Sequence, residues 1–131
     1  MASIHQETLI DARPEDVWAA LRDVGALHTR LVPGFVVDTK LEDGARIVTF
    51  GNGMVVRELI VDVCDETRRV AWSVVGGRFT HHNASAQVFD DGTGRTRFVW
   101  IADLLPHEIA GDIRALIVQG SAVIKRTMER R

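Results

Sequence analysis

The chain has 131 residues, 46% of them hydrophobic, and a formal net charge of −2 from 16 basic and 18 acidic residues. This length suits one domain, 1–131, with a single core, and the balanced charge without a basic block excludes the electrostatic footprint of a nucleic-acid-binding protein. A single cysteine excludes an internal disulfide framework, and because there is no leader-like N-terminus and no apolar run of about 18 residues, we expect a cytoplasmic protein without membrane insertion.

The N-terminal quarter of the chain predicts a strand followed by two short helices. Residues 3–11 alternate in polarity with period two, which is typical of a strand with one buried face. Pro14, followed by two acidic residues, begins a short helix that Gly25 closes. A second helical piece, 26–31, ends before a Pro-Gly pair.

From residue 35 onward the period-two pattern repeats between turn signals at regular intervals. The turns are rich in Gly, Asp and Asn, and such short connections join antiparallel neighbours. We therefore predict a meander of six strands at 35–41, 45–50, 54–64, 69–75, 80–89 and 95–104.

The last part of the chain, 106–131, predicts one long amphipathic helix. Its apolar residues recur at steps of three, four and seven, and Pro106 suits the first helical position. Gly120 interrupts the apolar stripe at a cost of about 1 kcal/mol relative to Ala. Two interpretations of Gly120 stay open: close packing of a strand against the helix, or room for a ligand.

These elements together predict an α+β fold. A seven-stranded antiparallel sheet would carry the long helix on one face, with the two short helices between the first two strands. Because a wide sheet twists and coils, it should curve around the helix, and a cavity can open between the two.

Several segments resemble a known superfamily. Residues 10–18, Ile-Asp-Ala-Arg-Pro-Glu-Asp-Val-Trp, are similar to the signature I-x-A-P-x-x-x-V-W of the START and birch-pollen-allergen superfamily (SRPBCC, helix-grip fold), with Arg13 where Pro is frequent. Further similarity, to its polyketide cyclase/dehydrase branch and to plant abscisic-acid receptors, lies in residues 68–77, 83–85, 94–100 and 105–106. The resemblance implies a sheet curved around the C-terminal helix. It does not choose among lipid carriers, hormone receptors and aromatase/cyclases.

Glu58 is the first candidate for a polar pocket residue. Both faces of the 54–64 run are rather apolar, so periodicity does not decide which one points inward. The resemblance implies that Val56, Glu58 and Ile60 line the pocket. A carboxylate buried there would favour the neutral acid or a general-base role, unless a cation offsets it. The alternative is a surface Glu that pairs with Arg57 or across the strands.

His82 is the second candidate. It lies on the apolar face of the 80–89 run, and its neighbour His81 points to the opposite face, so the two cannot chelate one metal ion. A neutral imidazole could orient a ligand carbonyl or hydroxyl and, near Glu58, move a proton. A hydrogen-bonded core histidine is an equal alternative. We expect no metal and no cofactor.

The remaining candidates would form an apolar wall. Trp72 and Trp100, with Gly120 opposite, suit a flat apolar ligand, and small residues on neighbouring strands leave room for it. The Gly-Asn-Gly segment 51–53 lies where the abscisic-acid receptors carry a gate loop, although a tight hairpin is the simpler interpretation. The predicted ligand-binding set is Val56, Glu58, Ile60, Trp72, Val74, His82, Ala84, Ala86, Phe98, Trp100, Leu116 and Gly120.

Three functions fit this sequence. We favour a protein that binds a small hydrophobic molecule, lipid-like or aromatic, between sheet and helix, with Glu58 and His82 at the polar end of the ligand. The second is an enzyme of the polyketide cyclase/dehydrase type that uses Glu58 or His82 as acid or base. The third is an interaction module whose cavity is filled with side chains. The oligomeric state, a homodimer included, stays open.

Overall fold

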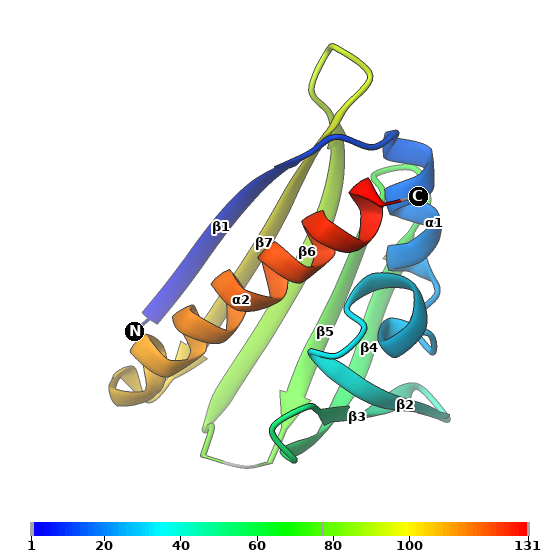
Figure 1. The fold of residues 1–131 in the computed structure, drawn as a ribbon. Helices are drawn as coiled ribbons and strands as arrows, with labels where there is room; N and C mark the ends of the chain where they lie inside the picture. Colours follow the sequence, from blue (N-terminus) through cyan, green and yellow to red (C-terminus); the bar gives the residue numbers. More distant parts are fainter. Residues whose placement is uncertain (1, 77, 131) are drawn as a thin grey trace.

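The computed structural model describes residues 2–76 and 78–130, and it shows a curved antiparallel sheet with a long helix against its concave face (Figure 1). The strand order is β1-β7-β6-β5-β4-β3-β2, so the six later strands form the predicted meander and the first strand pairs with the last. The predicted strands are confirmed, with ends that differ by at most one residue: β1 (Ala2–Ile10), β2 (Val36–Glu42), β3 (Ala45–Phe50), β4 (Val55–Cys64), β5 (Arg69–Val75), β6 (His81–Asp90) and β7 (Thr96–Leu105).

The helices also follow the prediction, with one correction at the start of the last one. The helix α1 (Pro14–Arg22) begins at its proline, and η1 (Leu27–Leu31) is a short π-type turn. The C-terminal helix begins with the 3-10 turn η2 (His107–Ile109) and continues as α2 (Ala110–Glu129). Pro106 therefore precedes the helix, because its backbone is extended, with ψ of 165°.

The core lies between α2 and the sheet, and α1 and η1 cover one end of it (Figure 1). The apolar stripe of α2 faces this core, where Ile117, Ile124 and Met128 are buried. On the sheet side, Ile4 and Phe98 are each 1% exposed. Burial of a side chain of this size contributes roughly 1.5–3 kcal/mol, so the stripe holds α2 in place.

The β3–β4 turn is a tight hairpin, as the simpler interpretation of residues 51–53 predicted. The Gly53 amide donates to the Phe50 carbonyl over 2.9 Å, and Gly53 has a φ of +90°, which favours glycine. The Gly51 amide donates to the Phe35 carbonyl over 2.9 Å. A Cβ on Gly51 would lie 2.5 Å from the Gly34 carbonyl oxygen, so glycine lets the two loops pack together.

Gly120 makes room for aromatic rings. A Cβ at this position would lie 3.0 Å from the Trp100 ring and 3.1 Å from the Phe35 ring. The helix thus packs closely on a strand, as one interpretation expected, and the contact is made by a side chain of β7 and by Phe35. The space beside Gly120 is occupied by the protein itself.

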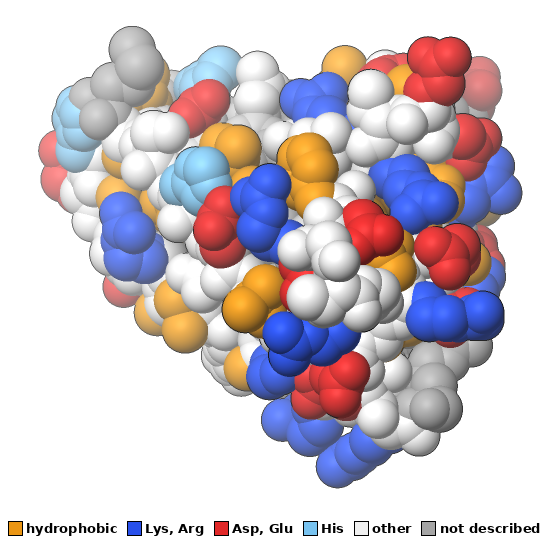
Figure 2. Space-filling view, turned by 90° about the horizontal axis from the view of Figure 1, so that it is seen from above, with side chains coloured by type: hydrophobic (Ala, Val, Ile, Leu, Met, Phe, Trp, Pro, Cys, Tyr) orange, Lys and Arg blue, Asp and Glu red, His pale blue; other side chains and the backbone are white. Residues whose placement is uncertain are grey.

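The surface carries both signs of charge. Figure 2 shows basic and acidic side chains interspersed on the face that carries α1 and the β6–β7 turn. Ion pairs between residues close in sequence join Arg13 to Asp16 and Arg95 to Asp91. Within residues 2–76 and 78–130, no helix combines the length and apolarity needed to cross a bilayer.

Replacing Gly120 by Leu should lower the free energy of unfolding by about 1–3 kcal/mol, because the new side chain is forced against two packed aromatic rings. Urea denaturation measures the change. Gly111→Leu on the same helix is the matched control: nothing lies within 4 Å of a Cβ there, so stability should be unchanged or raised by up to about 1 kcal/mol. Equal destabilisation by both variants would contradict the packing role of Gly120.

Candidate functional site

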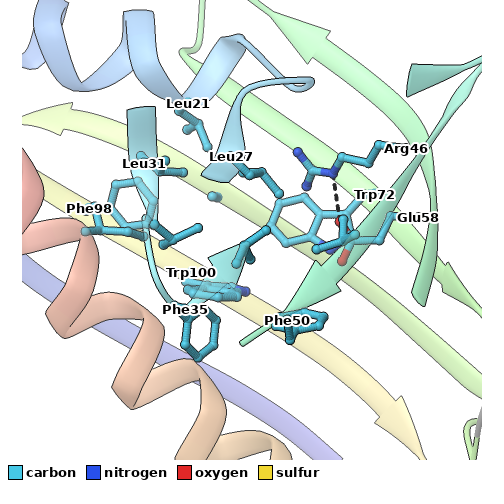
Figure 3. Close-up of a pocket in the computed structure, with 15 residues that line it drawn as sticks. Leu21, Leu27, Leu31, Phe35, Arg46, Phe50, Glu58, Trp72, Phe98 and Trp100 are labelled. Carbon is cyan, nitrogen blue, oxygen red and sulfur yellow. Dashed lines mark hydrogen bonds and ion pairs between the residues drawn. The ribbon is translucent and has the colours of Figure 1, made fainter. Parts of the chain in front are cut away.

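Two small cavities lie end to end between the sheet and α2, and each has a volume of about 70 Å³. The first, which we call the inner chamber, lies beneath Leu21 of α1 and Leu27 of η1. The second, which we call the His82 chamber, is lined by His82, Phe79 and Leu116, among others. The residues that line both chambers form a partition between them: Phe35, Phe50, Glu58, Trp72 and Trp100 (Figure 3).

Glu58 faces the interior and is paired with a cation. The Arg46 Nε atom donates to Glu58 Oε1 over 2.7 Å, and the two side chains are only 3% and 9% exposed. Arg46 also donates to the Val24 carbonyl over 3.3 Å and lies 5.3 Å from the Trp72 ring centre (Figure 3). The charge of Glu58 is therefore balanced inside the protein, and the carboxylate is held in one position.

The alternative of a surface Glu58 beside Arg57 does not hold, whereas its other form, an ion pair across the strands, is present in the interior as the pair with Arg46 of β3. Arg57 points to the outer face of the sheet, where it pairs with Glu42 over 3.3 Å. Since adjacent strand residues point to opposite faces, this places Glu58 inward together with the half-buried Val56 and Ile60.

Sequence reasoning missed Arg46, although the hairpin contains the necessary signal. The turn at 51–53 places Phe50 opposite Met54, and counting back along both strands places Arg46 opposite Glu58, as the register of the pairing shows. Residues opposite each other in an antiparallel pair share a face. A basic residue opposite a pocket carboxylate could thus have been found from the turn alone.

His82 lines its chamber, and one of its ring nitrogens is buried and unsatisfied. Its Nδ1 atom has no hydrogen-bond partner among the described residues. The alternative of a core histidine that is hydrogen-bonded through Nδ1 is therefore wrong. The edge of the ring packs against Phe79, with ring centres 4.5 Å apart. Burial, with a smaller contribution from His81, lowers the pKa of His82 to about 4, so the imidazole is neutral at physiological pH.

The structure brings most of the predicted ligand-binding residues to the two chambers. Ile60 lies outside both linings and packs against the core, Ala84 is buried in the core, and Gly120 lies beneath the Trp100 ring. The chambers are lined by the other nine, namely Val56, Glu58, Trp72, Val74, His82, Ala86, Phe98, Trp100 and Leu116.

Several lining residues were not predicted, because they lie at loop ends or on helices where strand periodicity carries no information. Phe35 follows a Pro-Gly pair and Phe50 precedes the β3–β4 turn; their rings meet edge to face at 5.6 Å. Within the described part of the chain, the His, Cys, Asp and Glu side chains form no group of three or more that could hold a metal ion.

Comparisons with known proteins identify the family and the fold of this chain. The family model for polyketide cyclase/dehydrase and lipid transport matches residues 1–130. No curated protein sequence gives a significant match. Among solved structures, the Bacillus cereus protein XoxI is similar with a TM-score of 0.87 and 18% identity, over 98% of this chain and 96% of that chain.

Two further proteins in the same comparison share the fold at similarly low identity. Norcoclaurine synthase from Thalictrum flavum, solved in complex with dopamine and hydroxybenzaldehyde, has a TM-score of 0.74 and 20% identity, over 98% of this chain and 84% of that chain. The protein Ara h 8.0201 has a TM-score of 0.78 and 14% identity, over 99% of both chains. At this level of identity the likeness shows the helix-grip fold alone.

Removing one partner of the buried ion pair should strongly lower the free energy of unfolding. Arg46→Met should lower the free energy of unfolding by about 3–5 kcal/mol, because it leaves the Glu58 carboxylate buried and unpaired, and Arg46→Met/Glu58→Leu should recover most of the loss. Arg57→Met, which breaks the neighbouring pair on the outer face, should cost at most about 1 kcal/mol. Urea denaturation of the three variants would refute the buried pair if Arg46→Met matched Arg57→Met.

The pH dependence of stability should carry a contribution from His82. Between its ordinary pKa of 6.5 and the folded value of about 4, the unfolded chain binds a proton that the folded chain does not, so stability falls as the pH falls through this range. For a half-buried ring we expect a loss of about 2 kcal/mol. His82→Phe should abolish this loss of stability at low pH, whereas His81→Phe should retain most of the loss. Thermal denaturation from pH 7 to pH 4 tests this, and parallel profiles for wild type and His82→Phe would contradict it.

Proposed function

Because this chain belongs to the polyketide cyclase/dehydrase and lipid transport family, we propose that it binds a small hydrophobic molecule, lipid-like or aromatic, between its sheet and α2. The observation that carries the proposal is an apolar interior that is not filled and that contains an unsatisfied polar atom, Nδ1 of His82. A buried polar atom without a partner costs about 1–3 kcal/mol, and a ligand that bonds to it recovers this cost. Glu58 and His82 would orient the polar end of the ligand.

The partition between the chambers is the part that must move when a ligand binds. Each chamber of about 70 Å³ is far below the roughly 300–1,000 Å³ of typical ligand pockets. Trp72 and Trp100 lie in the middle of strands, whereas Phe35 and Phe50 lie next to the glycines of two loops and are half-buried. We therefore assign the movement to the two Phe rings. Their displacement joins the chambers into one cavity.

A polyketide cyclase/dehydrase-type enzyme is the second candidate. It is favoured by one observation: Glu58 and His82 line the same chamber, as an acid and a base that share a substrate must. Glu58→Gln distinguishes the two functions, provided that thermal denaturation shows that the variant is folded, because the substitution leaves the Arg46 guanidinium without its charged partner. A binder retains its ligand with weakened affinity, whereas an enzyme retains binding and loses most of its turnover.

Native mass spectrometry of the protein, purified gently from its own host, tests the proposal. We expect an additional mass that disappears on denaturation. Ala86→Leu, which fills the inner chamber, should abolish or reduce it, and Ala115→Leu on the exposed face of α2 should not. Thermal denaturation confirms that both variants are folded. An unchanged mass, with no thermal stabilisation by sterols, fatty acids or aromatic polyketides, would contradict the proposal and favour the interaction module.

A further inference from the structure

A hollow on the convex face of the sheet lies on the side away from α2 and the two chambers (Figure 1). It has a volume of about 400 Å³ and spans strands β4 to β7, and we call it the outer hollow. The register places its lining on this face: Val75 lies opposite Arg57, which points outward, and alternate residues of a strand share a face. The side chains that line it from this face are Val61, Asp62, Arg69, Ala71, Asn83, Ser85, Gln87, Ile101 and Asp103.

Two small residues form the floor of the outer hollow. Ala71 and Ser85 lie opposite each other on β5 and β6, and each is 8% exposed. In the same row of the sheet, Asp62 of β4 lies next to Ala71, and Ile101 of β7 lies next to Ser85. The hollow therefore results from two short side chains that stand between longer ones on one face of the sheet.

The hydroxyl of Ser85 has no partner at this floor. Ser85 is buried and lines the hollow, and its side chain forms no hydrogen bond with another described residue. The hydroxyl is still accessible, because the fully enclosed side-chain atoms without a partner, among the residues described, are Nδ1 of His82 and Oγ of Ser121. A polar group with little access to water and no partner favours a ligand that bonds to it.

Charges of both signs at the rim of the outer hollow are also unpaired. Arg69 is half-buried, and neither Arg69 nor Asp62 forms an ion pair or a side-chain hydrogen bond within the described part of the chain. Asp62 lies opposite Ala71, two residues along β5 from Arg69, so the two charged side chains begin about 7–8 Å apart on one face. A third charged residue, Asp103, accepts a hydrogen bond from the Ser3 hydroxyl over 2.6 Å.

This set of groups selects a ligand that carries both signs of charge. An anion would be attracted by Arg69 but repelled by the carboxylates of Asp62 and Asp103, and a cation would be repelled by Arg69. A zwitterion offers a carboxylate to the guanidinium and an ammonium group to a carboxylate, and hydrogen bonds between ionised groups are the strong ones. An α-amino acid carries its two charged groups on one carbon atom, which suits two partners on adjacent strands. The volume of the hollow is within the range of small-molecule sites.

On this basis we propose that the outer hollow is a second binding site, which takes a small zwitterion, an α-amino acid with an apolar side chain. The carboxylate of the ligand accepts hydrogen bonds from the Arg69 guanidinium and the Ser85 hydroxyl, and its ammonium group donates to Asp62. The apolar side chain of the ligand lies over Ala71 toward Ile101. This site is on the opposite face of the sheet from the two chambers, so it does not depend on the proposed function.

NMR titration of the isotope-labelled protein with three probes of one carbon skeleton tests the class of ligand. The probes are L-leucine, isocaproate, which is leucine without its ammonium group, and isopentylamine, which is leucine without its carboxylate. We expect L-leucine to shift the amide signals of Ala71 and Ser85, and to bind at least about tenfold more tightly than either of the other two, because each of these lacks one charge-assisted contact.

Three outcomes of this titration would overturn the inference. They are equal binding of the three probes, no shift at Ala71 and Ser85 with L-leucine, and shifts confined to residues that line the two chambers. The last outcome would place the ligand in the interior, and would thus support the proposed function while refuting a site on the convex face.

Matched variants locate the contacts, and the amide spectrum of each variant shows whether it is folded. Arg69→Met should reduce the affinity for L-leucine at least about tenfold, whereas Arg57→Met, on the same face of the sheet but outside the hollow, should not change it. Asp62→Asn should weaken the binding of L-leucine and leave that of isocaproate unchanged or stronger, because isocaproate has no ammonium group to lose a partner. Identical effects of Arg69→Met and Arg57→Met would refute the outer hollow as the site.

Discussion

The buried ion pair of Arg46 and Glu58 is the interaction on which the interior of this protein depends. A carboxylate or a guanidinium alone in this position would be strongly destabilising, so each requires the other. The groups that hold Arg46 come from separate parts of the chain: Glu58 on β4, the Val24 carbonyl after α1, and the Trp72 ring on β5. The pair therefore joins the helical end of the molecule to the middle of the sheet, and it fixes a polar point in an otherwise apolar space.

Because the charges of Arg46 and Glu58 balance each other, His82 is the polar side chain of the chamber linings that can form a new hydrogen bond with a ligand. Its Nδ1 atom is buried and unsatisfied, while the charges beside it are compensated. The fold supplies the curved sheet and the crossing helix, which structures of very different sequence share. Within that fold, this chain places a carboxylate paired with Arg46 and an imidazole whose Nδ1 atom has no partner among the described residues.

The sequence predicted the elements well because each carries a strong periodic signal. The period-two pattern predicted the ends of each strand to within one residue, and the apolar stripe predicted the long helix α2. The site was harder to predict, for physical reasons. Both faces of β4 are apolar enough that its inward face came from the resemblance. The partition residues Phe35 and Phe50 lie at loop ends, where no period applies, and the space beside Gly120 is filled by rings that are distant in sequence.

The contact between the two loops has a kinetic consequence. The Gly51 amide donates a hydrogen bond to the Phe35 carbonyl, and Gly51 packs directly on Gly34. The backbone segments that carry Phe35 and Phe50 are thus joined, and the two rings should move together in one cooperative step. Exchange of an enclosed molecule would then be limited by the frequency of this step and not by diffusion. Residence time would become a property of two loops that bear none of the polar groups that recognise the ligand.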